Sequence, residues 1–188
     1  MSYNQIRKTG IPVKARRVKD IREVANAVRK MFFIDKTVNC PITSVLELFG
    51  THLFPDYSFE VVDDNDPSLK GKFADTKPAE RHIRIKESVY NNACNGDGHA
   101  RYTIAHEFGH LFLEHEPDVT FAREMSTIDD EIPPFRSSEW QADTYAAELL
   151  MPKGLVDALS IEEVCEKCGV SYSAAETRLR KLNTTSWQ

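Results

Sequence analysis

Two histidines four residues apart, with a glutamate directly after the first, are the residues with the clearest chemistry. They are His106, Glu107 and His110, in the stretch RYTIAHEFGHLFLE at residues 101–114. On a helix, this spacing puts both imidazoles on one face, where they can bind a single Zn²⁺. Glu107 is then placed to act on a zinc-bound water rather than to bind the metal. The H-E-x-x-H spacing therefore predicts a zinc site with a general base beside it.

The residues around this motif favour a helix that is buried on one side. At roughly 100° per residue, Ile104, Phe108 and Leu111 fall on the side away from the histidines. That side belongs in a core, and the histidine side would line a cleft. Gly109 lowers helix propensity by up to about 1 kcal/mol. We therefore interpret this glycine as room for a closely packed neighbour.

A tetrahedral catalytic zinc needs a third protein ligand and one open position. The stretch EWQADTYAAELL at residues 139–150 is predicted to be a helix that ends before Pro152. Alanines share the face of Glu139 and allow another helix to approach closely, whereas Glu148 points about 180° away. By itself, Glu139 would be interpreted as a carboxylate favoured by the helix dipole. Beside the histidine motif, it is the predicted third ligand.

Other residues of the two helices are candidates for supporting roles. Asp143, one turn after the third ligand, is placed to accept a hydrogen bond from the second ring nitrogen of a ligand histidine. Tyr102 and Tyr145 are candidate donors to an oxyanion, because one is on the metal-facing side and the other on the second helix. His115 falls opposite the ligand face and is expected at the surface. His99 is not assigned a role.

The remaining pattern predicts an α+β fold. The predicted helices cover residues 16–33 and 41–50, and the predicted strands cover 59–62, 69–74 and 81–86. We expect these strands to form a small antiparallel sheet before the histidine-bearing helix. The strand at 81–86 is expected at the sheet edge beside the cleft, where an extended peptide can add as another strand.

Two later segments differ in character. Residues 116–138 are rich in proline and acidic residues and are too long for a simple connector, so part of this loop, 125–134, is expected to cover the cleft. Residues 161–182 are predicted to form two short helices with Gly169 in the turn, a spacing like that of helix-turn-helix motifs. Residues 160–188 hold four acidic and four basic side chains, whereas a groove-reading helix needs a basic surface. Packing or partner docking is therefore expected there.

Length and charge predict one globular domain of 188 residues. We divide it into a basic arm at 1–15, a core at 16–152 and a C-terminal helical segment at 153–188. Residues 1–30 carry nine basic and two acidic side chains, although the whole chain has a net charge of −5. A basic arm can meet nucleic acid or an acidic partner, but a solvated tail and helix face is favoured.

The sequence contains no apolar run near the roughly 18 residues of a membrane span. The first residues also lack the apolar segment of a secretory signal. Four cysteines without a disulfide framework fit a reducing compartment, so a cytoplasmic location is expected. Cys165 and Cys168 form a single C-x-x-C, without the second pair of a zinc ribbon or the βαβ context of a redox motif.

The sequences TIAHEFGHLFLEH and EWQADTYAAELLMP together resemble the ImmA/IrrE (DUF955) metallopeptidases of bacteria and phage. The resemblance is strongest over residues 81–152, weaker over 16–80, and extends to the helical tail. It implies a compact zincin-like α+β peptidase of the gluzincin type, with one Zn²⁺ per chain.

Residue by residue, the metal ligands of the family match His106, His110 and Glu139, and its catalytic glutamate matches Glu107. Asp143 stands where members often have Asn. This departure is compatible with an orienting role and makes the pocket more acidic. The resemblance thus implies Glu-assisted attack of zinc-bound water on a peptide bond.

The resemblance also suggests a substrate, because characterised members cleave helix-turn-helix repressors that are commonly encoded beside them. We therefore expect a zinc-dependent endopeptidase that cuts a specific transcription regulator. Two alternatives remain. In the first, the chain is a non-proteolytic regulatory or toxin–antitoxin binding module with a structural metal site, although such a site does not need Glu107. In the second, the chain is a DNA-binding protein. The negative net charge of the chain and the balanced charge of residues 160–188 argue against this alternative.

Overall fold

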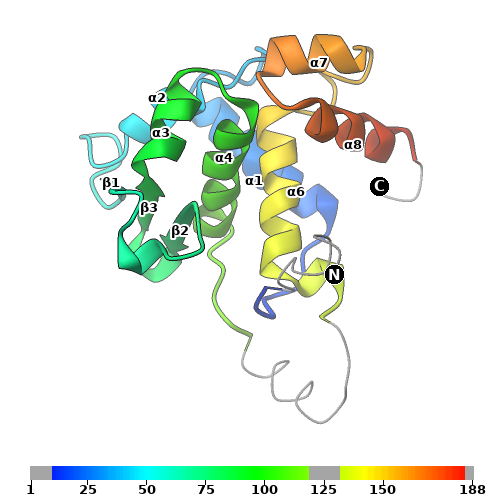
Figure 1. Ribbon diagram of the computed structural model, residues 1–188. Helices are drawn as coiled ribbons and strands as arrows, with labels where there is room; N and C mark the ends of the chain where they lie inside the picture. Colours follow the sequence, from blue (N-terminus) through cyan, green and yellow to red (C-terminus); the bar gives the residue numbers. More distant parts are fainter. Residues whose placement is uncertain (1–9, 119–131, 185–188) are drawn as a thin grey trace, which may run out of the picture.

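The computed structural model describes residues 10–118 and 132–184, which form helices around a small sheet (Figure 1). The helices are α1 (Val18–Met31), α2 (Ile42–Glu47), α3 (Glu87–Cys94), α4 (Gly98–Phe112), α6 (Ser138–Leu150), α7 (Ile161–Cys168) and α8 (Tyr172–Asn183). The strands are β1 (Ser58–Val62), β2 (Ala74–Lys77) and β3 (His82–Lys86). Short 3₁₀ helices are η2 (Pro67–Leu69), η3 (Pro78–Glu80) and η4 (Pro134–Arg136). The predicted α+β class is confirmed.

The sheet is mixed, and the prediction of an antiparallel sheet is wrong. Its order is β1-β3-β2, in which β2 pairs antiparallel and β1 pairs parallel with β3. Strands β1 and β3 run in the same direction because the chain reverses direction both before and after β2. The strand predicted at the edge, β3, is therefore central, and its Ile83 and Ile85 are fully buried. In the described part of the chain, β2 has a free edge instead.

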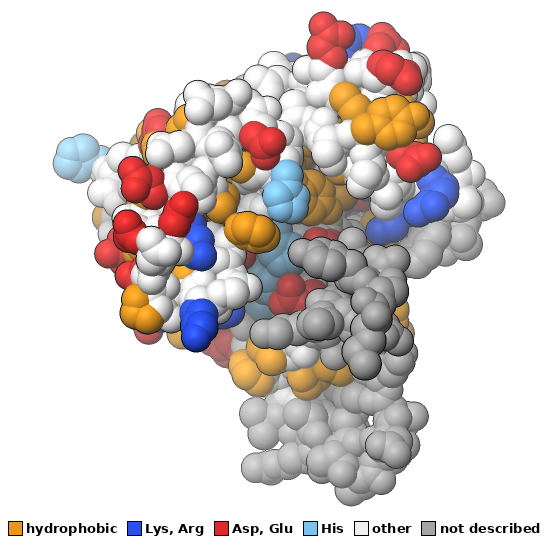
Figure 2. All heavy atoms as spheres, in the orientation of Figure 1, with side chains coloured by type: hydrophobic (Ala, Val, Ile, Leu, Met, Phe, Trp, Pro, Cys, Tyr) orange, Lys and Arg blue, Asp and Glu red, His pale blue; other side chains and the backbone are white. Residues whose placement is uncertain are grey.

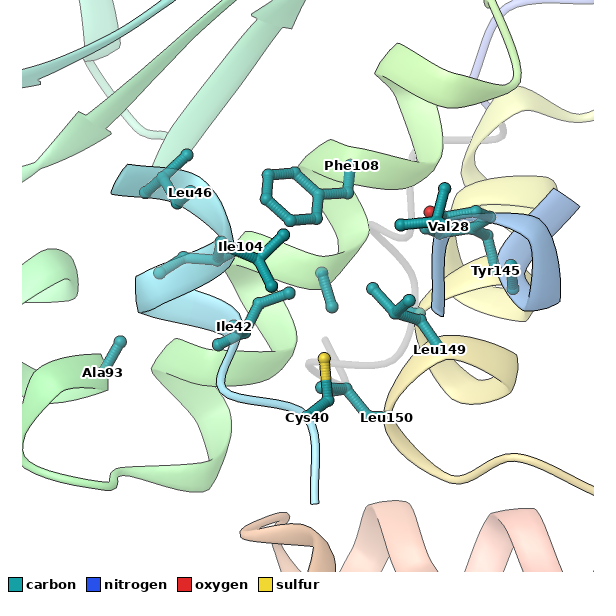
Figure 3. Packing of buried hydrophobic residues seen from close by; sticks show 14 of the residues in the cluster. Val28, Cys40, Ile42, Leu46, Ala93, Ile104, Phe108, Tyr145, Leu149 and Leu150 are labelled. Atoms are coloured by element: carbon teal, nitrogen blue, oxygen red, sulfur yellow. The ribbon is translucent and has the colours of Figure 1, made fainter. Parts of the chain in front are cut away.

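Helices α4 and α6 pack side by side at the centre of the molecule (Figure 1). A Cβ atom added to Gly109 would lie 2.7 Å from Cα of Ala142, a distance that side chains do not tolerate. The interpretation of Gly109 as room for a neighbour is thereby confirmed. On its other side, α4 directs Ile104 and Phe108 into the core toward Leu46 of α2 (Figure 3). The helix is thus fixed on its apolar side, which leaves the histidine side toward the surface.

The two predicted C-terminal helices are present as α7 and α8, and Gly169 between them adopts a left-handed conformation with φ of 62°. Arg178 of α8 is buried and donates to both carboxylate oxygens of Glu148 on α6, at 2.9 and 2.7 Å. Arg101 of α4 donates to the carbonyls of Gly169 at 2.9 Å and Cys168 at 3.2 Å. Buried arginines therefore attach this segment to the core.

Residues 10–16 lie between the end of α4 and the start of α6, and we call them the N-terminal strap. All but the last of them belong to the predicted arm. The backbone N–H of Val13 donates to the carbonyl of Arg136 at 2.8 Å. The Nη2 group of Arg16 donates to the carbonyl of Leu113 at 2.9 Å. The strap therefore joins the ends of the two central helices.

The structure contains one helix that was not predicted, and most of one predicted segment lies outside the described residues. The sequence pattern did not predict α3, which buries only Val89 and Ala93 and therefore shows little periodicity. Most of the loop predicted to cover the cleft falls in residues 119–131, outside the described residues. None of the helices in the described ranges is long and apolar enough to cross a membrane.

Candidate metal centre

Helices α4 and α6 bring the three predicted metal ligands together. His106 and His110 come from α4, and Glu139 comes from the first turn of α6. The Nε2 atoms of the histidines lie 3.0 Å apart. The carboxylate oxygens of Glu139 lie 3.3 Å from Nε2 of His106 and 3.5 Å from Nε2 of His110. Figure 2 shows histidine and acidic side chains gathered in a hollow on this face.

The spacing of these atoms fits a metal ion. Two ligand atoms that are each about 2.0–2.2 Å from a tetrahedral zinc lie roughly 3.3 Å apart, close to the observed distances. Two imidazole nitrogens and a carboxylate oxygen are also a ligand set that Zn²⁺ accepts. Without a positive charge between them, their lone pairs would face one another. The donor set therefore suits a divalent cation.

Asp143 lies beside the first histidine. Its Oδ1 atom lies 3.0 Å from Nδ1 of His106, so the carboxylate accepts the Nδ1 proton and leaves the Nε2 lone pair toward the cluster. The hydroxyl of Tyr102 donates to the backbone carbonyl of Asp143 at 2.9 Å. This contact ties α4 to α6 beside the site. The structure thus puts Asp143 where its predicted role requires it.

Glu107 is buried beside the cluster and contacts the edge strand β2. The hydroxyl of Thr76 donates to its Oε2 atom at 2.6 Å. Thr76 pairs with Ile83 in the sheet, so both side chains lie on the face that packs against α4. Sequence reasoning missed Thr76, because a strand of four residues shows too little alternation to identify its inward-facing positions.

Electrostatics favour a positive charge at the cluster. Burial opposes protonation of His106, but hydrogen bonds to Asp143 and Glu139 outweigh it and raise the pKa of His106 to about 10. Burial and the charge on His106 lower the pKa of His110 to about 3. Burial also raises the pKa of Glu107, against the attraction of His106. The acidic groups around the two histidines therefore favour a cation at this position.

The two candidate oxyanion donors are directed elsewhere. Tyr145 is fully buried in the core, and its hydroxyl has no hydrogen-bond partner within the described residues. It follows Asp143 by two residues, which turns it to the core side of α6. Tyr102 would have to break its hydrogen bond to the Asp143 carbonyl to face an oxyanion.

His115 was expected at the surface, and that prediction is wrong. Its ring is buried, with Nδ1 2.8 Å from Nδ1 of His110 and Nε2 3.2 Å from Oε1 of Gln141. A surface position for His115 would require α4 to continue past Phe112. The helix ends there instead, and Glu114 adopts a left-handed conformation with φ of 50°. The N–H of His115 then donates to the carbonyl of His110 at 3.1 Å, which closes a Schellman-type cap. Such a cap is hard to predict where the left-handed residue is not glycine.

Two adjacent helices that bring a histidine pair and a carboxylate to one point, beside a small sheet, define a zincin-like metallopeptidase domain. Residues 67–180 match the peptidase M78 family, in the form of its IrrE N-terminal-like domain. The chain belongs to this family, and the resemblance to the ImmA/IrrE family is confirmed.

One solved structure, a Mycobacterium tuberculosis transcriptional regulator, resembles the chain with a TM-score of 0.54 and 17% sequence identity. The match covers 90% of this chain and 53% of the regulator, so the chain spans about half the length of that protein. At this identity, the likeness shows the fold alone. No curated protein matches the chain.

Proposed function

We propose that the protein is a zinc-dependent endopeptidase that cuts a specific protein. The observation that carries this proposal is the convergence of His106, His110 and Glu139 beside the buried carboxylate of Glu107. Three protein ligands leave one position of a tetrahedral zinc open, as catalytic sites require. No fourth histidine, cysteine or acidic ligand joins the cluster within the described residues. A structural site would be closed by a fourth ligand.

Each residue has a role in peptide hydrolysis. The zinc would be held by His106, His110 and Glu139. It would act as a Lewis acid that lowers the pKa of its water to about 7 and polarises the peptide carbonyl. Glu107 accepts a proton from the attacking water and delivers it to the leaving amine. Burial suits Glu107 to both steps, because it raises the pKa toward the working pH. Thr76 holds one carboxylate oxygen, which leaves the other for the proton.

The free edge of β2 is the proposed binding site for an extended peptide. The sequence pattern predicted this binding site on residues 81–86, but they form β3, the central strand. A peptide that adds to β2 would pass beside Glu107, because Thr76 of this strand contacts the Glu107 carboxylate. A peptide that binds as an added strand is recognised more through its backbone than through its sequence. Selectivity would therefore come from the loop at 116–138, the acidic body and the helical tail.

We infer that the substrate is a helix-turn-helix transcription regulator. The family resemblance suggests this class of substrate. The net charge of −5 also favours a basic partner such as a DNA-binding protein and disfavours the polyanion DNA itself. A narrow site would accept one accessible segment and exclude folded proteins in general. Basal activity is expected to be low until a signal or an activator releases it.

The test is incubation of the zinc-loaded protein with the regulator encoded beside its gene, with casein and with duplex DNA. Mass spectrometry should show one discrete cut in the regulator and none in casein. Glu107→Gln should lower cleavage by at least about 100-fold, while the fold and about one equivalent of zinc are retained. The reason is that Gln keeps the shape of Glu107 but cannot accept a proton.

The other outcomes separate the alternatives. Rapid degradation of casein without a discrete cut would defeat the specific-protease proposal. Unchanged cleavage by Glu107→Gln would refute the mechanism. Bound zinc without cleavage of any protein would favour the regulatory or toxin–antitoxin module. Tight, salt-sensitive binding of DNA without cleavage would favour a DNA-binding protein.

A further inference from the structure

The side-chain amide of Gln141 has one allowed orientation. It is fully buried, and its nitrogen Nε2 lies 2.9 Å from the carbonyl of Lys14 and 2.8 Å from the carbonyl of Phe135. Carbonyl oxygens only accept hydrogen bonds, so these two neighbours require the NH₂ group and use both of its hydrogens. The amide oxygen Oε1 is left as an acceptor that faces His115.

This orientation determines which ring nitrogens carry protons. Nε2 of His115 lies 3.2 Å from the amide oxygen of Gln141 and must donate to it. A neutral imidazole has one N–H, so Nδ1 of His115 is an acceptor. That nitrogen lies 2.8 Å from Nδ1 of His110, which must therefore be the donor. Nε2 of His110 is left with its lone pair toward His106 and Glu139. The opposite assignment would place two acceptors face to face at Gln141.

We propose that His115 and Gln141 are positioning residues, which hold His110 in the tautomer that binds the metal through Nε2. The inference rests on the proposed role of His110 as a metal ligand. His106 obtains the same tautomer directly from Asp143. His110 obtains it from a relay of uncharged groups, so the second ligand is oriented without a second negative charge.

The relay begins in the N-terminal strap. Lys14 supplies one of the two carbonyls that orient Gln141, and it lies outside residues 67–180, which match the family. Arg16 of the same strap donates to the carbonyl of Leu113, at the turn that carries His115. The strap therefore contacts the residues that orient His110, and these contacts come from outside residues 67–180.

Zinc affinity, measured by competition with a fluorescent chelator, tests the relay. Loss of a residue that orients a metal ligand typically costs 10- to 100-fold in affinity. His115→Ala and Gln141→Ala should weaken zinc binding by about this factor. His115→Asn should restore most of the affinity, because its Oδ1 atom can accept the His110 proton in place of Nδ1. His99→Ala, on the exposed part of the same helix, is the matched control and should not change the affinity.

A spectroscopic measurement separates positioning from mere packing. Long-range ¹H–¹⁵N spectra of the zinc-loaded protein should show the proton of His110 on Nδ1 and that of His115 on Nε2. The reverse tautomers, or wild-type affinity in His115→Ala, would overturn the relay. If His110→Ala and Glu139→Ala also kept full zinc binding, the metal site itself would be wrong. Loss of zinc in those two variants, with normal affinity in His115→Ala, would refute the relay alone.

Discussion

The two ends of α6 hold glutamates with opposite surroundings. Glu139, in the first turn, has a side chain that is 41% exposed and faces the imidazoles of His106 and His110. Glu148, near the other end, is fully buried between two arginines. Arg178 donates to both of its oxygens, and Arg22 also donates to both, each at 3.0 Å.

The difference lies in how each negative charge is balanced. The guanidinium groups around Glu148 are permanently charged, so this carboxylate is satisfied by the protein and joins α6 to α1 and α8. Imidazoles can bind a cation but do not carry a fixed charge. No lysine or arginine forms an ion pair with Glu139 in the described parts of the chain. A carboxylate left in this condition beside two histidines is suited to a metal, whereas the other is suited to stability.

The largest expected effect is at the metal end. Glu139→Ala removes one of the three proposed ligands and should reduce bound zinc from about one equivalent to little or none. Elemental analysis after gel filtration measures this. Glu166→Ala, an exposed carboxylate of α7, is the control and should keep its zinc. Full zinc content in Glu139→Ala would show that this residue is not a ligand.

At the other end, Glu148→Ala should lower the free energy of unfolding by about 3–5 kcal/mol, because it leaves Arg178 buried without its partner. Urea unfolding of metal-free protein measures the change. Glu148 points away from the metal-facing side of α6, so the folded variant should still bind zinc. A loss below about 1 kcal/mol, the range of exposed ion pairs, would contradict the comparison.

The buried ion pair should also be sensitive to acid. Burial opposes ionisation of Glu148, but the hydrogen bonds and charges of Arg178 and Arg22 outweigh it and lower the pKa of Glu148. Its stabilising contribution is therefore complete above the unfolded pKa, about 4.3, and is lost as the pH falls through the lower folded pKa. Metal-free wild type should lose stability in this range more steeply than Glu148→Gln. Parallel pH curves for the two proteins would argue against the ion pair.

The smallest expected effect concerns the contact between β2 and Glu107, the proposed general base. Thr76→Val removes a hydrogen bond to Glu107 that contributes about 1 kcal/mol, so kcat should fall roughly fivefold. Thr76→Ser keeps the hydroxyl and should retain most of the activity. Zinc content should be unchanged in both variants. Equal losses in the valine and serine variants would show that packing, not the hydrogen bond, is responsible.

The sequence by itself determined the features that repeat over a few residues. The spacing of His106 and His110 defined one face of α4, and the alternation at 81–86 identified β3 as a strand. Glu139 was a candidate because the chemistry of the histidines required a third ligand and a nearby helix offered one. Gly109 indicated room for a closely packed neighbour. Each of these inferences depends on local geometry, which backbone periodicity expresses directly.

Only the tertiary structure decided which distant groups meet. Three contacts join segments that share no local pattern. They are the parallel pairing of β1 with β3, the hydrogen bond of Thr76 to Glu107 and the ion pair of Arg22 with Glu148. Their partners are chosen by the packing of the whole core, in which many elements compete for the same positions. His115 was missed although it is close in sequence to His110. Glu114, a residue other than glycine, adopts the left-handed conformation there and ends the helix. The helical periodicity does not continue past such a residue.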